Sequence, residues 1–171
     1  MMIKRLVLSV LGLICLSANA DEVNTNADQQ LSDAFVRAAI SFISYSQAVE
    51  GDDANVLAAT LLDTAVKLNP ANEQAWAMRA ELAQTAGDQD AYEKALVGYL
   101  DTGIDDDRAR FELIRYRLGS NSTLDAQLSE LEKLLESEAG RALSDPLRSR
   151  LASFATSVAS ELLDESARRK W

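Results

Sequence analysis

The feature that most constrains this chain is a succession of helix-forming segments separated by short breaks. From residue 31 onward, segments of about 12 to 18 residues with helical apolar spacing alternate with breaks of about two to five residues. Gly51, Gly87 and Gly119 mark three of the breaks. Asn69-Pro70 marks another, because the residue before a proline avoids the helical conformation. No stretch alternates apolar and polar residues as a strand would, so the sequence predicts an all-α fold of antiparallel neighbours.

The breaks set the expected bounds of each helix. We expect helices over about residues 32–50, 53–68, 73–86, 89–101, 106–118, 123–138 and 146–168. Ser32 is expected to cap the first of them, because Leu31 and Val36 flank it in the arrangement of a hydrophobic staple. Pro146 is expected at the first position of the last helix, where its missing N–H costs nothing.

An internal period runs through the same region. The aromatic residues Phe42, Trp76 and Phe111 are spaced by 34 and 35 residues. The first copy also carries small and large residues at fixed offsets, namely Tyr45, Ser46 and Val49, then Ala58, Leu62 and Ala65, and a closing Pro70. Over residues 39–138 the chain therefore resembles the tetratricopeptide repeat family, whose unit is a helix pair of about 34 residues. The second and third copies are more degenerate, and a helical bundle with coincidental spacing is the alternative.

The resemblance implies a short tetratricopeptide-like solenoid of stacked antiparallel helix pairs over residues 31–143. Residues 144–171 are then expected to form a C-terminal amphipathic helix that caps the stack, because solenoids need a polar outer end. Its apolar residues recur at helical spacing and form one stripe, made of Leu147, Leu151, Phe154, Val158 and Leu162. Four serines lie away from that stripe, at positions 149, 153, 157 and 160. A helix that docks into a groove of another protein is the alternative.

The N-terminus has the layout of a secretory signal peptide over residues 1–20. Lys4 and Arg5 precede an apolar run from Leu6 to Leu16, and a small-residue cleavage pattern ends at Ala20. The run is shorter than the ~20 residues that span a bilayer, so no stable membrane anchor is expected. We expect cleavage after Ala20, a flexible polar lead over residues 21–30, and a periplasmic or secreted protein.

Composition excludes several kinds of chemistry. The chain has 27 acidic and 17 basic residues, one cysteine and no histidine. Without histidine it cannot build a Ser-His-Asp triad or an imidazole metal site, and one cysteine cannot form an intramolecular disulfide. The acidity argues against binding to nucleic acid, which needs a basic surface. We expect no cofactor and no metal. The acidic residues around Asp106 have a spacing similar to that of a calcium-binding loop. Such a loop requires glycine at the position that Asp106 occupies. We therefore expect the start of a helix there, with the carboxylates near its N-terminal dipole.

The expected function follows from the family resemblance. In tetratricopeptide proteins the first helix of each pair lines a groove that holds a peptide or a partner protein. Mapped onto this chain, the binding surface consists of Gln47, Glu50, Met78, Glu81 and Gln84. Its acidity favours a basic or polar partner. We therefore expect an exported protein–protein interaction module, a scaffold or adaptor and not an enzyme.

Two alternatives stay open. The chain could be the exported N-terminal part of a larger helical repeat protein. It could also be a small carboxylate-dependent cell-wall hydrolase, which would need two carboxyl groups about 5–10 Å apart in a cleft.

Overall fold

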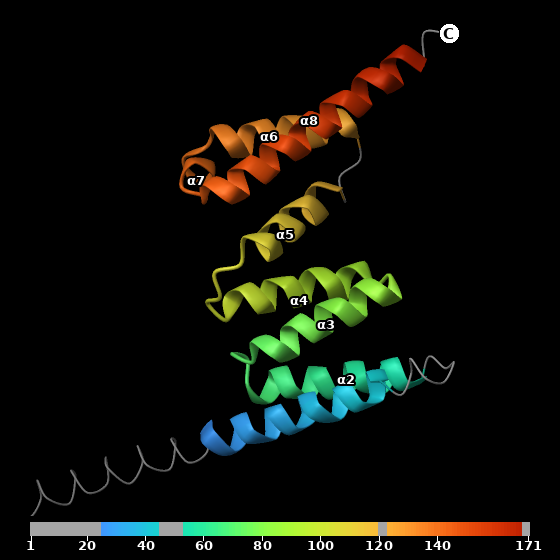
Figure 1. Cartoon of the computed structure of the whole chain (residues 1–171), viewed down its shortest axis with the longest axis vertical. Coiled ribbons are helices and arrows are strands. Elements are labelled where there is room, and N and C mark those ends of the chain that lie inside the picture. The colour runs from blue at the N-terminus through green and yellow to red at the C-terminus, as the bar shows by residue number, and fades with distance from the viewer. Residues whose placement is uncertain (1–24, 45–52, 120–122, 169–171) are drawn as a thin grey trace, which may run out of the picture. The chain divides into compact units, whose positions relative to one another are not determined.

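The protein is built from helices in every part that the structure describes. The computed structural model describes residues 25–44, 53–119 and 123–168. A first helix at residues 25–44 precedes α2 (Asp53–Leu68), α3 (Glu73–Ala86), α4 (Gln89–Asp101), α5 (Asp107–Gly119), α6 (Leu124–Glu136), α7 (Glu138–Arg141) and α8 (Asp145–Arg168) (Figure 1). These ranges contain no strand, so the expected all-α class is confirmed.

Some expectations fall outside the described ranges. The expected signal peptide at residues 1–20, with its cleavage site at Ala20, is among them, and so are Gln47 and Glu50. None of the described helices is long and apolar enough to cross a membrane.

The breaks between the helices have the local chemistry that the sequence predicts. At the start of α3 the Asn72 side chain accepts a hydrogen bond from the backbone N–H of Ala75 at 3.0 Å. At its end Gly87 adopts a φ of 70°, a left-handed conformation that favours glycine, and the N–H of Asp88 donates to the Ala83 carbonyl. The observed bounds of α2 to α5 therefore lie within one residue of the expected ones.

The chain divides into two compact units, residues 1–92 and 93–171, and each is described by itself. In the first unit the helix at residues 25–44, α2 and α3 share one hydrophobic core. Its buried members are mostly small, namely Val36, Ala39, Ala58, Leu62, Ala65, Val66 and Ala75. Alanines on all three helices let the backbones approach closely. Ala58, Leu62 and Ala65 are the repeat positions expected on the second helix, and all three are fully buried.

The start of the first helix differs from the expectation. Residues 25–30 of the expected polar lead are helical, so Ser32 lies inside the helix and is not its N-cap. Ser32 is instead fully buried, and its hydroxyl donates a hydrogen bond to the Ala65 carbonyl at 2.9 Å. A serine that satisfies a carbonyl on a neighbouring helix has the same local sequence as a cap, which is why the prediction was wrong.

The aromatic repeat positions lie at the edge of the core and not inside it. Phe42 is 37% exposed. Trp76 is half-buried against the core, and its indole N–H donates to the Pro70 carbonyl at 2.9 Å. Because alanines bring the helices of this unit together, an indole ring does not fit between them and packs along the rim.

In the second unit the C-terminal helix packs as its apolar stripe predicts. Leu147, Leu151 and Val158 of α8 are buried with Leu131 of α6 in a second core, and Phe111 and Phe154 pack against it. α8 contacts both α6 and α5. The other predicted member of the stripe, Leu162, is only partly buried.

The four-residue helix α7 was not expected. Its Gly140 is buried, and a Cβ atom at this position would lie 1.9 Å from the Leu134 carbonyl oxygen. Gly140 therefore allows the turn after α6 to fold back closely onto that helix.

Candidate functional site

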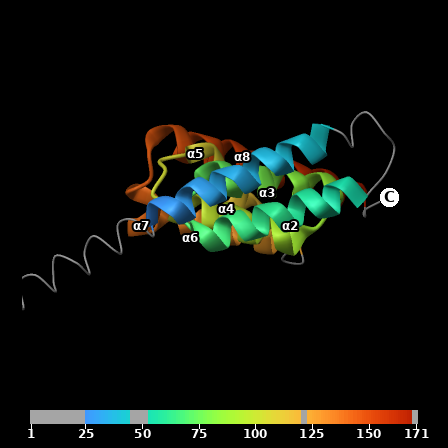
Figure 2. The same ribbon diagram turned by 90° about the horizontal axis from the view of Figure 1, so that it is seen from below.

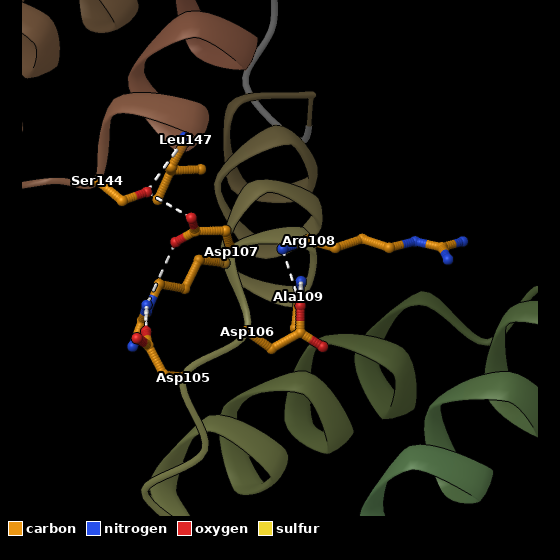
Figure 3. A network of polar contacts seen from close by, with 8 residues as sticks. Asp105, Asp106, Asp107, Arg108, Ala109, Ser144 and Leu147 are labelled. Carbon is orange, nitrogen blue, oxygen red and sulfur yellow. Dashed lines mark hydrogen bonds and ion pairs between the residues drawn. The ribbon is translucent and has the colours of Figure 1, made fainter.

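The candidate site of the second unit lies between α5 and α8, which are in contact. Its polar contacts begin at the start of α5. The Asp106 carboxylate accepts hydrogen bonds from the backbone N–H groups of Arg108 at 2.8 Å and Ala109 at 3.0 Å (Figure 3). These are orphan donors of the first helical turn, so Asp106 is the N-cap of α5. The helix start that the sequence predicts in this acidic segment is confirmed.

The start of α5 is tied to the start of α8 by a second aspartate. The hydroxyl of Ser144 donates to the Asp107 carboxylate and accepts from the backbone N–H of Leu147, the latter at 3.2 Å (Figure 3). One side chain thus caps α8 and holds it against the first turn of α5. This link fixes the two helices at one end, 37 residues apart in the chain.

The acidic segment is neutralised in part by Arg110. Its guanidinium forms ion pairs with Asp105 and, at 3.4 Å, with Asp107. The hydrogen bond with Asp105 raises the pKa of Arg110 above its usual value, against a smaller opposing effect of desolvation. Arg110 is therefore charged at every physiological pH, and it offsets the repulsion between the neighbouring carboxylates.

Beyond these caps an open groove of about 390 Å³ lies between the two helices. Phe111 of α5 and Phe154 of α8 meet edge to face in it, with ring centroids 6.1 Å apart and planes at 82°. The other lining residues come from α8, namely Ser149, Arg150, Ser153 and Ser157. Residues four apart share one helix face, so the three serines form a row of hydroxyl groups along the groove.

Arg150 gives the groove its charge. Its side chain is exposed, and within the described residues it forms no ion pair, whereas Arg148 of the same helix faces Asp145 at 3.8 Å. A guanidinium beside hydroxyl groups can hold a carboxylate through two parallel hydrogen bonds. The phenylalanine pair offers an apolar surface next to it. The groove thus has the chemistry to bind a segment that carries both a carboxylate and an apolar or aromatic side chain.

The binding surface expected from the repeat register is brought together only in part. Glu81 and Gln84 of α3 are exposed, as that surface requires. Met78 is partly buried and packs against the first core. Gln47 and Glu50 are outside the described residues.

The groove between α5 and α8 was not predicted from the sequence. The serines of α8 were visible as a row outside the apolar stripe, but nothing in the sequence shows which helix lies beside them. The signal that could have found the site is Arg150 within that row, a cation without an acidic residue at the spacing of three or four residues that joins Arg148 to Asp145.

A carboxylate-dependent hydrolase would need two carboxyl groups close together in a cleft. The buried polar residues of the described ranges are Ser32 and Asn72, and no aspartate or glutamate is buried there. Within the same ranges no three potential ligands are grouped to hold a metal ion.

Comparison with known proteins gives no family for this chain. No protein-family model matches the sequence, and a search of the curated proteins finds no significant relative.

Proposed function

We propose that the protein is an exported tetratricopeptide-like interaction module, a scaffold or adaptor that holds a segment of a partner protein. Support comes from helix bounds that follow the repeat period and from small residues buried at Ala58 and Ala65. In this proposal the helix pairs stack as a short solenoid, and α8 caps its end. Proteins made of stacked helix pairs are commonly used for binding, because the side chains of successive pairs form one extended surface.

The observation that carries the proposal is the groove between α5 and α8. It combines an apolar floor at Phe111 and Phe154, a row of hydroxyl groups and the cation Arg150. Peptide-binding sites need an apolar anchor and a few polar groups that fix orientation. We propose that the partner presents an acidic and aromatic segment to this groove, while Glu81 and Gln84 contact basic or polar residues elsewhere on the partner.

A peptide-binding measurement tests this proposal. The probes are a fluorescent peptide with two phenylalanines flanked by glutamates, and a matched peptide with glutamines in place of the glutamates. Fluorescence anisotropy is expected to show tighter binding of the acidic peptide, weakened at high salt. Arg150→Glu should weaken binding of the acidic peptide at least about tenfold, the effect expected on losing a charged hydrogen bond.

Arg148→Glu is the matched control, since it reverses a charge on the same helix outside the groove. It should leave the affinity within about twofold of the wild type. Equal binding of both peptides, or equal effects of the two variants, would remove the groove as the binding site. A loss of binding on charge reversal of Glu81 alone would move the site to α3.

Export is tested separately. The charged start, the apolar run and the small residues before Asp21 motivate it. The protein isolated from a cell envelope or culture medium should begin at Asp21 by N-terminal sequencing. A form that keeps Cys15 would contradict cleavage after Ala20.

A further inference from the structure

The first helix carries a second apolar stripe beside the one that forms the core. Leu31, Phe35, Ala38 and Phe42 follow each other at steps of four, three and four residues, so they share one helix face. Leu31 is 48% exposed and Phe42 is 37% exposed, while Phe35 packs partly against the core. Asp28, one turn before Leu31, ends the stripe on its N-terminal side.

The helix α2 carries a stripe with the same steps. It consists of Leu57, Leu61, Thr64 and Leu68. Leu57 is 50% exposed, and the other three are partly buried. Steps of four and three residues are those at which helices interdigitate in coiled coils and bundles.

The two stripes lie on the same side of the helix pair. The first helix and α2 run antiparallel beside each other (Figures 1 and 2). Asp33 of the first helix accepts a hydrogen bond from Asn72, and Asp63 of α2 pairs with Arg79 at 2.7 Å, so both aspartates mark the flank that faces α3. At 100° per residue each stripe falls on the opposite flank of its helix. Together the stripes form one surface, exposed at Leu31, Phe42 and Leu57 and partly buried at the other positions, which we call the outer apolar face.

We propose that the outer apolar face binds the same face of a second copy of this chain. None of the residues of the two stripes is charged, whereas the chain has a formal net charge of −10. A neutral surface is where two acidic copies can meet with least repulsion. Apolar surfaces of this kind on a soluble protein mark association sites.

The face is also complementary to itself. A stripe with steps of four, three and four reads the same in both directions, as a twofold axis requires. In an antiparallel pairing of the first helix with its copy, Phe35 meets Ala38. In a pairing of the first helix with α2 of the second copy, Phe35 meets Thr64 and Ala38 meets Leu61. Either twofold arrangement places a bulky side chain opposite a small one, and the dimer contact becomes a four-helix bundle.

Analytical ultracentrifugation of the protein, in the form isolated from cells, tests the proposal. Over about 1–100 µM we expect a monomer–dimer equilibrium, strengthened by salt because screening reduces the repulsion between acidic copies. Leu31→Glu combined with Leu57→Glu should raise the dimer dissociation constant at least about 100-fold, since each buries a charge in the contact.

Val56→Glu is the matched control, because Val56 is 63% exposed on α2 but lies off the stripe. It should leave the dissociation constant within about threefold of the wild type. Leu57→Gln provides a milder variant with a smaller weakening in the same direction, should the paired variant lose helicity by circular dichroism.

A wild type that is monomeric at every concentration would overturn the proposal. So would a wild type whose dimer is weakened equally by Val56→Glu and by the stripe variants. A monomer whose melting temperature falls in the stripe variants would instead mean that a segment of the same chain covers the face. These outcomes do not depend on the groove at α5 and α8, so they leave the proposed peptide binding untouched.

Discussion

The side-chain amide of Asn72 donates a hydrogen bond to the hydroxyl of Ser32 at 2.8 Å, across 40 residues of the chain. The same Ser32 hydroxyl donates a hydrogen bond to the Ala65 carbonyl at 2.9 Å. The side-chain oxygen of Asn72 accepts a hydrogen bond from the backbone N–H of Ala75 at the start of α3. Two buried polar side chains thus join the first helix, α2 and α3. In a core made largely of alanines, these directional bonds set how the three helices are placed.

Replacing Ser32 with alanine is expected to lower the free energy of unfolding by about 1–3 kcal/mol. The change leaves the buried Ala65 carbonyl without its side-chain donor and Asn72 with one acceptor fewer. Chemical denaturation followed by circular dichroism measures the effect. Ser41→Ala is the control, because Ser41 is exposed on the same helix and bonds only to its own helix at Arg37. A loss as small as in Ser41→Ala would show that the buried bonds add no net stability.

Replacing Gly140 with alanine is expected to cost about 2 kcal/mol or more. The added Cβ would lie 1.9 Å from the backbone oxygen of Leu134, so α7 would have to move away from α6. Gly119→Ala is the control, since no atom lies within 4 Å of a Cβ there, and it should change stability by less than about 1 kcal/mol. Thermal melts of both variants give the comparison. Equal melting temperatures would mean that α7 moves away at little cost.

Replacing Trp76 with alanine is expected to cost about 2–3 kcal/mol, less than the ~3–5 kcal/mol typical of a buried aromatic residue. The indole is half-buried, so the change removes only part of a core contact together with the hydrogen bond to Pro70. Urea denaturation followed by circular dichroism measures the loss. A cost below about 1 kcal/mol would show that the rim contact of Trp76 contributes little to the first unit.

Replacing Ser144 with alanine is expected to cost about 1–2 kcal/mol. The serine both caps α8 and donates to Asp107, so one substitution removes the cap and the link to α5. Ser149→Ala on the same helix is the control, because Ser149 lines the groove and caps nothing. Hydrogen exchange should show faster exchange at the first turn of α8 in Ser144→Ala alone. Unchanged exchange there would contradict the capping role.

Most helix ends follow from local sequence. Asn69-Pro70 and Gly87 act within a few residues of their own position, so local chemistry was enough to place the helix bounds beside them. The apolar stripe of α8 was equally readable, because helical periodicity alone shows that Leu147, Leu151 and Val158 share one buried face.

Packing sets the role of the polar residues whose partners lie far away in the chain. Ser32 has the sequence of an N-cap, but its partner is a carbonyl 33 residues away, so only packing shows that it is a buried link between helices. Met78, expected on the binding surface, also packs against the first core, a contact that depends on where the neighbouring helices lie.

The groove shows the same division between local and distant causes. The spacing of the serines on α8 can be read from the sequence. The groove also needs Phe111 of α5, which lies 38 to 46 residues earlier in the chain. Periodicity tells which face of a helix is apolar, because it depends only on the helical repeat. It cannot tell which helix covers that face, because that choice is settled by the volumes and hydrogen bonds of residues far apart in the chain.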